Sequence, residues 1–222
     1  MTEIDLTGDV VTDADKWFYD WLDLPCISPS SLKEALDKDE EIILNVNSPG
    51  GSVSAGQEIY TKLLMAPQNV VVNVTGQACS AASFFIMAAD QINISPVGQI
   101  MIHNVSTYAD GNKNDFGKMA ETLCLFDSSL ANAYVKHTGL TKQEVLDLMD
   151  EETWLGADKA VELGFADTII ADEELELVAS TGHVFPHDKL AKLKELIEGK
   201  AETKTAETNA SNNNAFLRYG GL

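Results

Sequence analysis

One serine, Ser80, stands where the sequence predicts a tight turn between a strand and a helix. The preceding run, 70–74, is apolar and mostly β-branched, the run 84–89 is apolar again, and small residues separate the two. A hydroxyl at such a corner lies beside the free N–H groups of the helix's first turn. Acyl-transfer enzymes build a nucleophile and its oxyanion hole in this way. Close packing of a helix on a sheet also requires small residues, so the corner makes Ser80 a candidate only.

Two further segments supply groups that such a serine would need. Residues 47–52 read Asn-Ser-Pro-Gly-Gly-Ser after the apolar run 42–46, and paired glycines let a backbone present N–H groups at close range. His103 ends the short apolar run 100–102, and an imidazole is the general base that a serine nucleophile requires. Taken singly, these are also an ordinary turn before a helix and a structural histidine. In combination with Ser80 they indicate nucleophilic acyl transfer.

Taken in order, these motifs resemble the Clp protease proteolytic subunit family of serine peptidases. The matching segments are 47–51, 76–80, 101–103 and 152–167, and the resemblance extends over about residues 40–170. The Glu-Thr-Trp form of residues 152–154 is most similar to the phage-encoded branch, the head maturation (prohead) proteases. The resemblance implies an α/β fold of the Clp protease/crotonase-like type, with repeated ββα units and a protruding long handle helix.

The same resemblance implies a role for each matched residue. Ser80 matches the nucleophile and His103 matches the general base. The backbone N–H groups of Gly51, the second glycine of the pair, and of Ala81, just after the serine, match the oxyanion hole. The chain order of serine, histidine and then acid also differs from the serine, acid, histidine order of α/β-hydrolases.

The third member of the triad is the least constrained of these residues. Glu152 occupies the position of the family's aspartate, directly before Thr-Trp-Leu-Gly-Ala, and a glutamate can orient an imidazole as an aspartate does. Asp150 and Glu151 are close enough in the sequence to compete for this place. The resemblance implies no cofactor and no metal.

The composition limits the partners that the chain can have. Its 222 residues include 15 Lys and Arg against 35 Asp and Glu, a formal net charge of −20. A surface of that charge repels phosphates, so we expect no sequence-independent nucleic-acid binding. No run reaches the roughly 18 apolar residues of a membrane span, and residues 1–5 lack the basic region of a signal peptide. We therefore expect a cytoplasmic protein that does not bind membranes.

The three cysteines predict a reducing compartment. Cys26, Cys79 and Cys124 have no spacing typical of a disulfide framework or a metal site. Cys79 neighbours Ser80, but we expect a small packed side chain there and not a catalytic thiol.

The chain divides into four segments by composition and periodicity. Residues 1–28 are an acidic, aromatic lead-in, and residues 29–172 form the Clp protease-like peptidase domain, with strands and helices alternating over 41–89 as in parallel βαβ units. Residues 173–198 predict a strand and helix extension. Residues 199–222 have almost no large apolar side chains and predict a flexible tail.

Two apolar clusters need a covering surface. The segment 114–137 predicts a long helix with a stripe at three- and four-residue steps, formed by Phe116, Met119, Leu123, Phe126, Leu130, Ala133 and Tyr134. In the resembled family this helix is the handle that joins two rings, so we expect a homo-oligomeric ring, with an ordinary core helix as the alternative. The aromatic residues of 17–22 are expected to cover the sheet, with docking of a partner as the alternative.

Three functions remain open. The first is an ATP-independent serine endopeptidase of the phage head maturation type, which cleaves scaffold or major capsid proteins inside the immature head in the host cytoplasm. The second is an acyl-CoA enzyme of the related crotonase superfold, which pairs backbone amides but does not need Ser80 with His103. The third is a non-catalytic assembly subunit, which an intact serine and histidine disfavour. The first function uses every matched residue.

Overall fold

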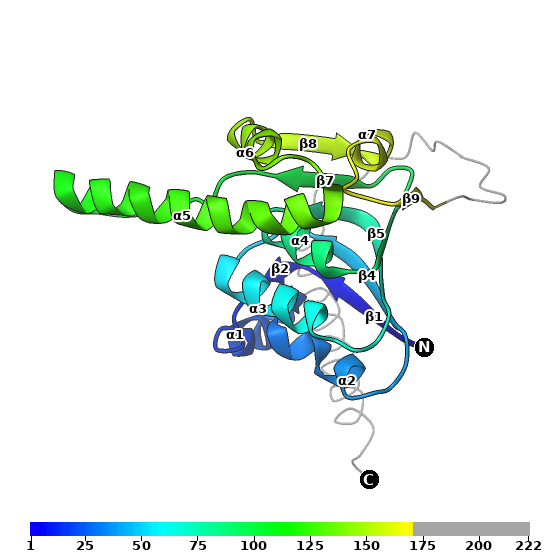
Figure 1. The fold of residues 1–222 in the computed structure, drawn as a ribbon. Coiled ribbons are helices and arrows are strands. Elements are labelled where there is room, and N and C mark those ends of the chain that lie inside the picture. Colours follow the sequence, from blue (N-terminus) through cyan, green and yellow to red (C-terminus); the bar gives the residue numbers. More distant parts are fainter. Residues whose placement is uncertain (171–222) are drawn as a thin grey trace, which may run out of the picture. The chain divides into compact units, whose positions relative to one another are not determined.

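The computed structural model describes residues 1–170 and has a mixed α/β fold built on one main sheet (Figure 1). The sheet has seven strands in the order β1-β4-β5-β6-β9, and β7 extends it by pairing with β5 and β8. Its strands are β1 (Thr2–Thr7), β4 (Ile42–Ser48), β5 (Val70–Cys79), β6 (Gln91–Ile94), β7 (Gln99–Ile102), β8 (Thr153–Gly156) and β9 (Thr168–Ile169). A second, two-stranded sheet joins β2 (Asp9–Val10) to β3 (Cys26–Ile27).

The helices occur between the strands, as the expected βαβ alternation requires. They are α1 (Lys16–Trp21), α2 (Lys33–Leu36), α3 (Val53–Leu64), α4 (Ala81–Phe85), α5 (Lys113–Thr138), α6 (Lys142–Asp150) and α7 (Ala157–Glu162). Short 3-10 turns at Pro29–Leu32 and Ile86–Ala88 precede α2 and follow α4. All strand pairs of the main sheet are parallel except β7 with β8.

Strand β5 changes partner along its length. Residues 71–74 pair with β6, whereas residues 77–79 pair with β7. Gly76 lies between the two stretches, and a Cβ there would lie 2.5 Å from the side-chain oxygen of Asn47. The same oxygen accepts a hydrogen bond from the N–H of Gln77 at 3.1 Å. The glycine therefore allows a close approach that turns the end of β5 toward β7.

The two faces of the sheet differ because side chains alternate along a strand. The face toward the helices is buried and aliphatic, through Ile42, Leu44, Val46, Val70, Val72, Val74, Ile92 and Ile94. On the opposite face, Asn93 donates to Asn73 at 2.9 Å and Asn73 donates to Asn45 at 3.0 Å. Each buried aliphatic side chain stabilises the fold by roughly 1.5–3 kcal/mol. The asparagine row cross-links three strands without needing an apolar cover.

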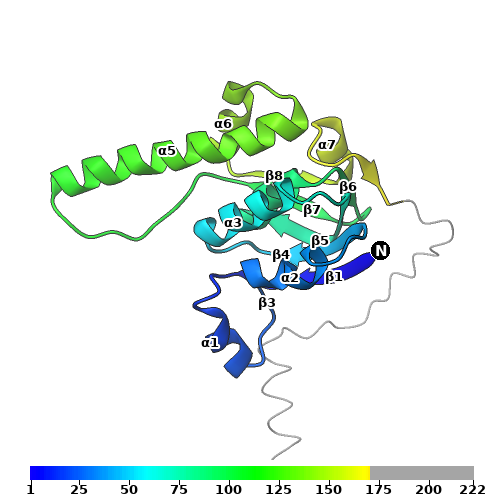
Figure 2. The same cartoon turned by 60° about the horizontal axis from the view of Figure 1, so that its bottom comes forward.

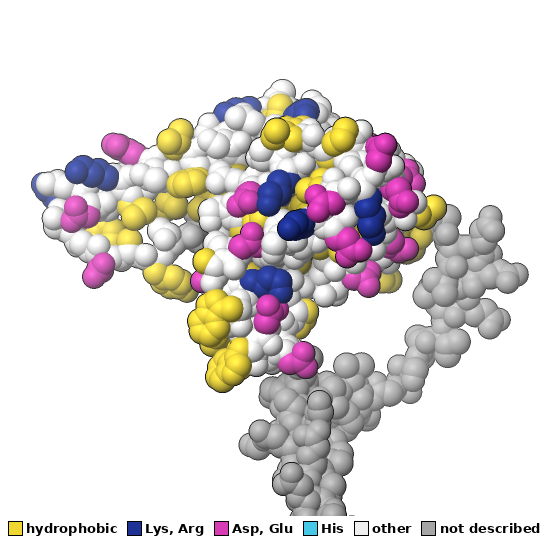
Figure 3. Space-filling model, turned by 90° about the horizontal axis from the view of Figure 1, so that it is seen from below, with side chains coloured by type: hydrophobic (Ala, Val, Ile, Leu, Met, Phe, Trp, Pro, Cys, Tyr) yellow, Lys and Arg dark blue, Asp and Glu magenta, His cyan; other side chains and the backbone are white. Residues whose placement is uncertain are grey.

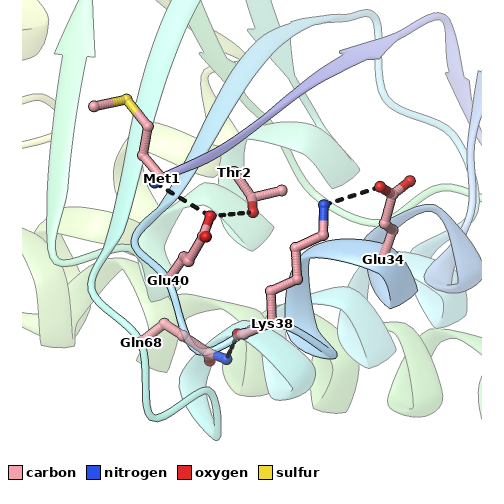
Figure 4. Close-up of polar contacts among 6 residues, drawn as sticks. All are labelled: Met1, Thr2, Glu34, Lys38, Glu40 and Gln68. Atoms are coloured by element: carbon pink, nitrogen blue, oxygen red, sulfur yellow. Dashed lines mark hydrogen bonds and ion pairs between the residues drawn. The ribbon is translucent and has the colours of Figure 1, made fainter.

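The first residues of the chain complete one edge of the sheet. Strand β1 pairs with β4 from Thr2 opposite Ile42 onward. The carboxylate of Glu40 accepts a hydrogen bond from Thr2 Oγ1 at 3.2 Å and lies 3.2 Å from the amino group of Met1 (Figure 4). These contacts, the one with the amino group first, hold the pKa of Glu40 below its ordinary value. The lead-in thus contributes a strand to the main sheet.

The expectation that the aromatic residues of 17–22 cover the sheet is wrong. Helix α1 has no buried residue, and Trp17 and Trp21 are 67% and 74% exposed. Figure 3 shows large hydrophobic side chains gathered on the lobe that carries this helix. Neighbouring rings of this helix contact one another, and the rings of Trp17 and Phe18 meet edge-on.

The predicted long helix is confirmed, as α5 extends from Lys113 to Thr138. Only its second half is anchored in the core, through Leu130, Ala131, Ala133 and Tyr134. Its first half projects from the body (Figures 1 and 2) and exposes Phe116 by 51% and Phe126 by 37%. The alternative of an ordinary core helix therefore describes only the second half of α5, where the residues of the stripe are buried.

The expected extension and tail, residues 173–222, lie outside the described residues. Within residues 1–170, no helix combines the length and the apolar character that crossing a membrane would require.

Candidate active site

The ends of two neighbouring strands bring Ser80 and His103 together. Strands β5 and β7 pair in parallel up to Cys79 and Met101, and the N–H of Ser80 continues the ladder by donating to the Met101 carbonyl at 2.9 Å. His103 follows β7 directly, so its side chain emerges at the same edge as the serine. Its Nε2 lies 2.7 Å from Ser80 Oγ, within hydrogen-bonding distance. The predicted strand-turn-helix corner therefore carries a serine in contact with an imidazole.

The backbone at Ser80 is held in an unusual conformation. Ser80 caps helix α4 with φ 53° and ψ −120°, although a side chain disfavours positive φ. Such backbone strain costs on the order of 1–3 kcal/mol and persists only where the surroundings enforce it. The sharp corner presents the hydroxyl at the end of the strand, as a nucleophile needs.

The paired glycines pack directly against this corner. A Cβ at Gly50, which has φ 95°, would lie 2.5 Å from the Cys79 carbonyl oxygen and 2.7 Å from Ser80 Cβ. The Gly50 carbonyl accepts a hydrogen bond from the N–H of Val10 at 2.8 Å. No side chain fits at residue 50 without moving the serine, which explains the glycine there.

Two backbone N–H groups near the serine have no hydrogen-bond partner among residues 1–170. The bridge between Val10 and Gly51 uses the Gly50 carbonyl and the Ser52 N–H, so it does not occupy the N–H of Gly51 itself. Ala81 is the first residue of α4, and N–H groups of a first helical turn have no partner within the helix. Both groups are available to a developing oxyanion.

A small pocket of about 60 Å³ opens beside Ser80 and His103. Its walls combine apolar side chains from α3, α4, α5 and α6 with the polar groups of Ser80 and of the segment 103–106; the apolar side chains are Val53, Phe84, Leu130 and Met149. A side chain of an acyl substrate would be held here next to the hydroxyl.

The segment after His103 is attached at two points. Asn104 donates from Nδ2 to the carboxylate of Asp150 at 2.6 Å, and the N–H of Val105 donates to Asp127 at 2.7 Å. These two acceptors fix the chain as it leaves β7 toward the handle. No sequence pattern predicts either contact, because both depend on the way α5 and α6 pack.

No carboxylate forms a hydrogen bond with His103 among residues 1–170, so the structure does not join the third member to the pair. The antiparallel pairing of β7 with β8 places Ile102 opposite Thr153. His103 and Glu152 are the next residues beyond this last pair, and Glu152 has a positive φ of 50° and donates its N–H to the Met149 carbonyl at 3.2 Å. The side chain of Glu152 is exposed, whereas Asp150 is already engaged by Asn104.

Other chemistry at this corner has less support. Cys79 is buried, and desolvation raises the pKa of its thiol, which disfavours the reactive thiolate. Within the described part of the chain, no three His, Cys, Asp or Glu side chains converge as metal ligands would.

A family model described as Clp protease matches residues 31–173. The chain belongs to the Clp protease family. ATP-dependent Clp protease proteolytic subunit 2 from Rhodococcus jostii (strain RHA1) is a relative, 32% identical over 142 residues that span 63% of this chain and 73% of that protein. The Clp protease family consists of serine peptidases, and the α/β fold with its mainly parallel sheet agrees with this membership.

Proposed function

We propose that the chain is a serine endopeptidase in which Ser80 is the nucleophile and His103 the general base. The distance of 2.7 Å between Ser80 Oγ and His103 Nε2 is the observation that carries the proposal. As Oγ attacks the scissile carbonyl, Nε2 takes its proton and then gives it to the leaving amine. The N–H groups of Gly51 and Ala81 stabilise the oxyanion. A water molecule, deprotonated by His103, then attacks the acyl-enzyme, and the acyl group leaves as a carboxylic acid while Ser80 regains its proton.

The pocket beside Ser80 favours a small side chain on the acyl side of the cleaved bond. Its volume of about 60 Å³ has room for a few heavy atoms, and Phe84 and Leu130 line it.

Labelling by a fluorophosphonate separates this function from the acyl-CoA alternative. We expect stoichiometric phosphonylation of Ser80, located by peptide mass mapping, because the reagent traps a serine activated by a base. His103→Ala should slow the labelling strongly, while Ser54→Ala, which removes an exposed serine hydroxyl at the start of α3, should not. A folded protein that the reagent leaves unmodified would contradict the peptidase assignment.

We further propose that the peptidase belongs to the phage head maturation branch and acts without ATP on scaffold or capsid proteins. The Glu-Thr-Trp form of residues 152–154 supports this. The test is to co-express the chain with any capsid and scaffold proteins that its gene neighbourhood encodes. Cleavage that the Ser80→Ala variant abolishes is expected; active enzyme that leaves both proteins intact contradicts the role but not the peptidase.

We propose that the chain assembles into a homo-oligomeric ring, since members of the Clp protease family form oligomeric rings and act on protein substrates. The projecting half of α5 supports this, because Phe116, Leu125 and Phe126 are exposed along it. An apolar strip of this length left in water would promote aggregation. Contact with a second copy would bury it.

Replacing Leu123 and Phe126 with aspartate is expected to dissociate the oligomer and lower activity. Neither residue lines the pocket at Ser80, so any loss of activity reports assembly. Sedimentation velocity with circular dichroism separates dissociation from unfolding. The double variant Asn114→Asp/Cys124→Asp adds the same charge at exposed positions that face away from the stripe, and it should assemble normally. A wild-type protein that is a fully active monomer at micromolar concentration would contradict the ring.

A further inference from the structure

Two side chains and one backbone carbonyl connect the handle helix to the nucleophile by hydrogen bonds. The hydroxyl of Tyr134, on the anchored half of α5, lies 2.7 Å from Ser83 Oγ. Ser83 Oγ in turn donates to the carbonyl oxygen of Ser80 at 2.7 Å. Tyr134 and Ser83 are 3% and 0% exposed, so water does not compete for these bonds.

The direction of each bond follows from the number of protons. Ser83 has one hydroxyl proton, and it goes to the Ser80 carbonyl, which can only accept. The proton between the two hydroxyls therefore comes from Tyr134. Burial raises the pKa of Tyr134 far above its ordinary value, so the phenol keeps this proton at every pH of interest. The hydrogen bonds therefore all point one way: Tyr134 donates to Ser83, and Ser83 donates to the Ser80 carbonyl.

The carbonyl at the end of this chain shares a peptide plane with an oxyanion-hole group. The carbonyl oxygen of Ser80 and the N–H of Ala81 belong to one rigid trans peptide and point in opposite directions. The oxygen also accepts the N–H of Ser83 at 2.9 Å, so Ser83 holds it from two sides. Fixing this oxygen inside α4 fixes the N–H of Ala81 outward, toward the pocket that Ser80 and Ala81 line.

We propose that Ser83 and Tyr134 are positioning residues that orient the Ser80–Ala81 peptide for catalysis, an inference that rests on the proposed peptidase function. Their hydrogen bonds hold the plane whose N–H stabilises the oxyanion, at a residue whose own φ of 53° is strained. Accepting a short hydrogen bond on the carbonyl also polarises the amide and makes its N–H a stronger donor. Neither side chain needs to touch the reacting atoms.

A purely structural role makes a different set of predictions. Buried hydroxyls need partners in any protein, so losing one would lower stability whether or not the site is affected. A positioning role instead lowers the rate of acyl transfer and the affinity for a tetrahedral adduct. Ground-state binding of the peptide should be unchanged, since the N–H of Ala81 gains most of its bond in the transition state.

The test compares Ser83→Ala, Tyr134→Phe and the double variant of the full chain on a peptide substrate. We expect kcat to fall about tenfold in Ser83→Ala and about threefold in Tyr134→Phe, with less than about a twofold change in KM. The double variant should match Ser83→Ala, because the Tyr134 hydroxyl acts only through Ser83. Affinity for a peptide aldehyde, whose adduct carries the oxyanion, should fall in parallel with kcat.

Two matched variants serve as controls. Tyr60→Phe removes the same atom from a half-buried tyrosine on α3, and Ser129→Ala removes a serine hydroxyl that donates to the Leu125 carbonyl within α5. Both should keep wild-type kcat and aldehyde affinity. If Ser83→Ala fails to fold, Tyr134→Phe carries the test, because phenylalanine keeps the ring in place.

The outcomes separate this inference from the function on which it rests. Active wild-type protein with unchanged kcat and aldehyde affinity in the variants overturns the positioning role alone. Variants that lose thermal stability but keep the wild-type kcat also overturn the positioning role alone. A wild-type protein that a fluorophosphonate does not label overturns the peptidase assignment, and the positioning role with it.

Discussion

Replacing Ser80 with alanine is expected to lower peptidase turnover by a factor on the order of 10⁴ to 10⁶ while the fold stays intact. The change removes only the hydroxyl that lies 2.7 Å from His103. Alanine and serine are similarly strained at positive φ, so the corner should keep its shape. Turnover of a peptide substrate by separately expressed and purified proteins measures the loss, and circular dichroism checks the fold.

Cys79→Ala is the matched control for this substitution. It removes one heavy atom from the adjacent residue, as Ser80→Ala does at residue 80. The Cys79 thiol is buried, and burial raises its pKa. Its turnover should remain within a few-fold of wild type. Near-normal turnover by Ser80→Ala would instead remove Ser80 from the mechanism, and Cys79 and Ser83 would become the candidates.

The contact between Ser80 and His103 could be anticipated because both residues follow short apolar runs. Parallel strands end at the same edge of a sheet, so residues placed just after two adjacent strands meet there. The residue types also carried information: only a glycine fits at residue 50, and small residues allow α4 to start directly beside the strand. Local sequence therefore contained most of what positions this pair.

Other parts of the fold depend on distant packing and could not be read locally. Strand β1 has charged residues at alternate positions and acquires its identity from pairing with β4, about forty residues away. The exposure of Trp17 and Trp21 depends on whether the monomer offers a surface to cover them. Tyr134 reads as one more residue of an apolar stripe, and its hydroxyl gains a role only because α5 crosses Ser83.

The choice among Asp150, Glu151 and Glu152 shows the same limit at the site itself. Three consecutive acids are equivalent in composition, and one residue of shift changes the direction in which a side chain points. The strand register favours Glu152, since the last observed pair is Ile102 with Thr153, and His103 and Glu152 are the next residues along the two chains. Asp150 instead accepts a hydrogen bond from Asn104 and holds the segment that follows β7.

Replacing Glu152 with glutamine is therefore expected to lower kcat by about 10⁴. Glutamine keeps the shape of the side chain but loses the charge that holds the imidazole in the productive tautomer and stabilises the imidazolium. Glu152→Asp, which restores the acid found in the resembled family with a shorter reach, should recover much of the lost rate. Steady-state kinetics on the assembled protein measures both variants.

Asp150→Asn and Glu151→Gln are the matched controls, because each removes one charge from the same turn. We expect a loss of less than about tenfold in Asp150→Asn, since an amide oxygen can still accept the hydrogen bond from Asn104. A large loss in Asp150→Asn with a normal Glu152→Gln would move the acid by two residues and contradict the register argument. If none of the three substitutions matters, no side chain of this turn orients His103, and the imidazole must be held by a backbone carbonyl or by water. The pattern across the three variants thus decides between strand register and sequence proximity as the determinant of the triad.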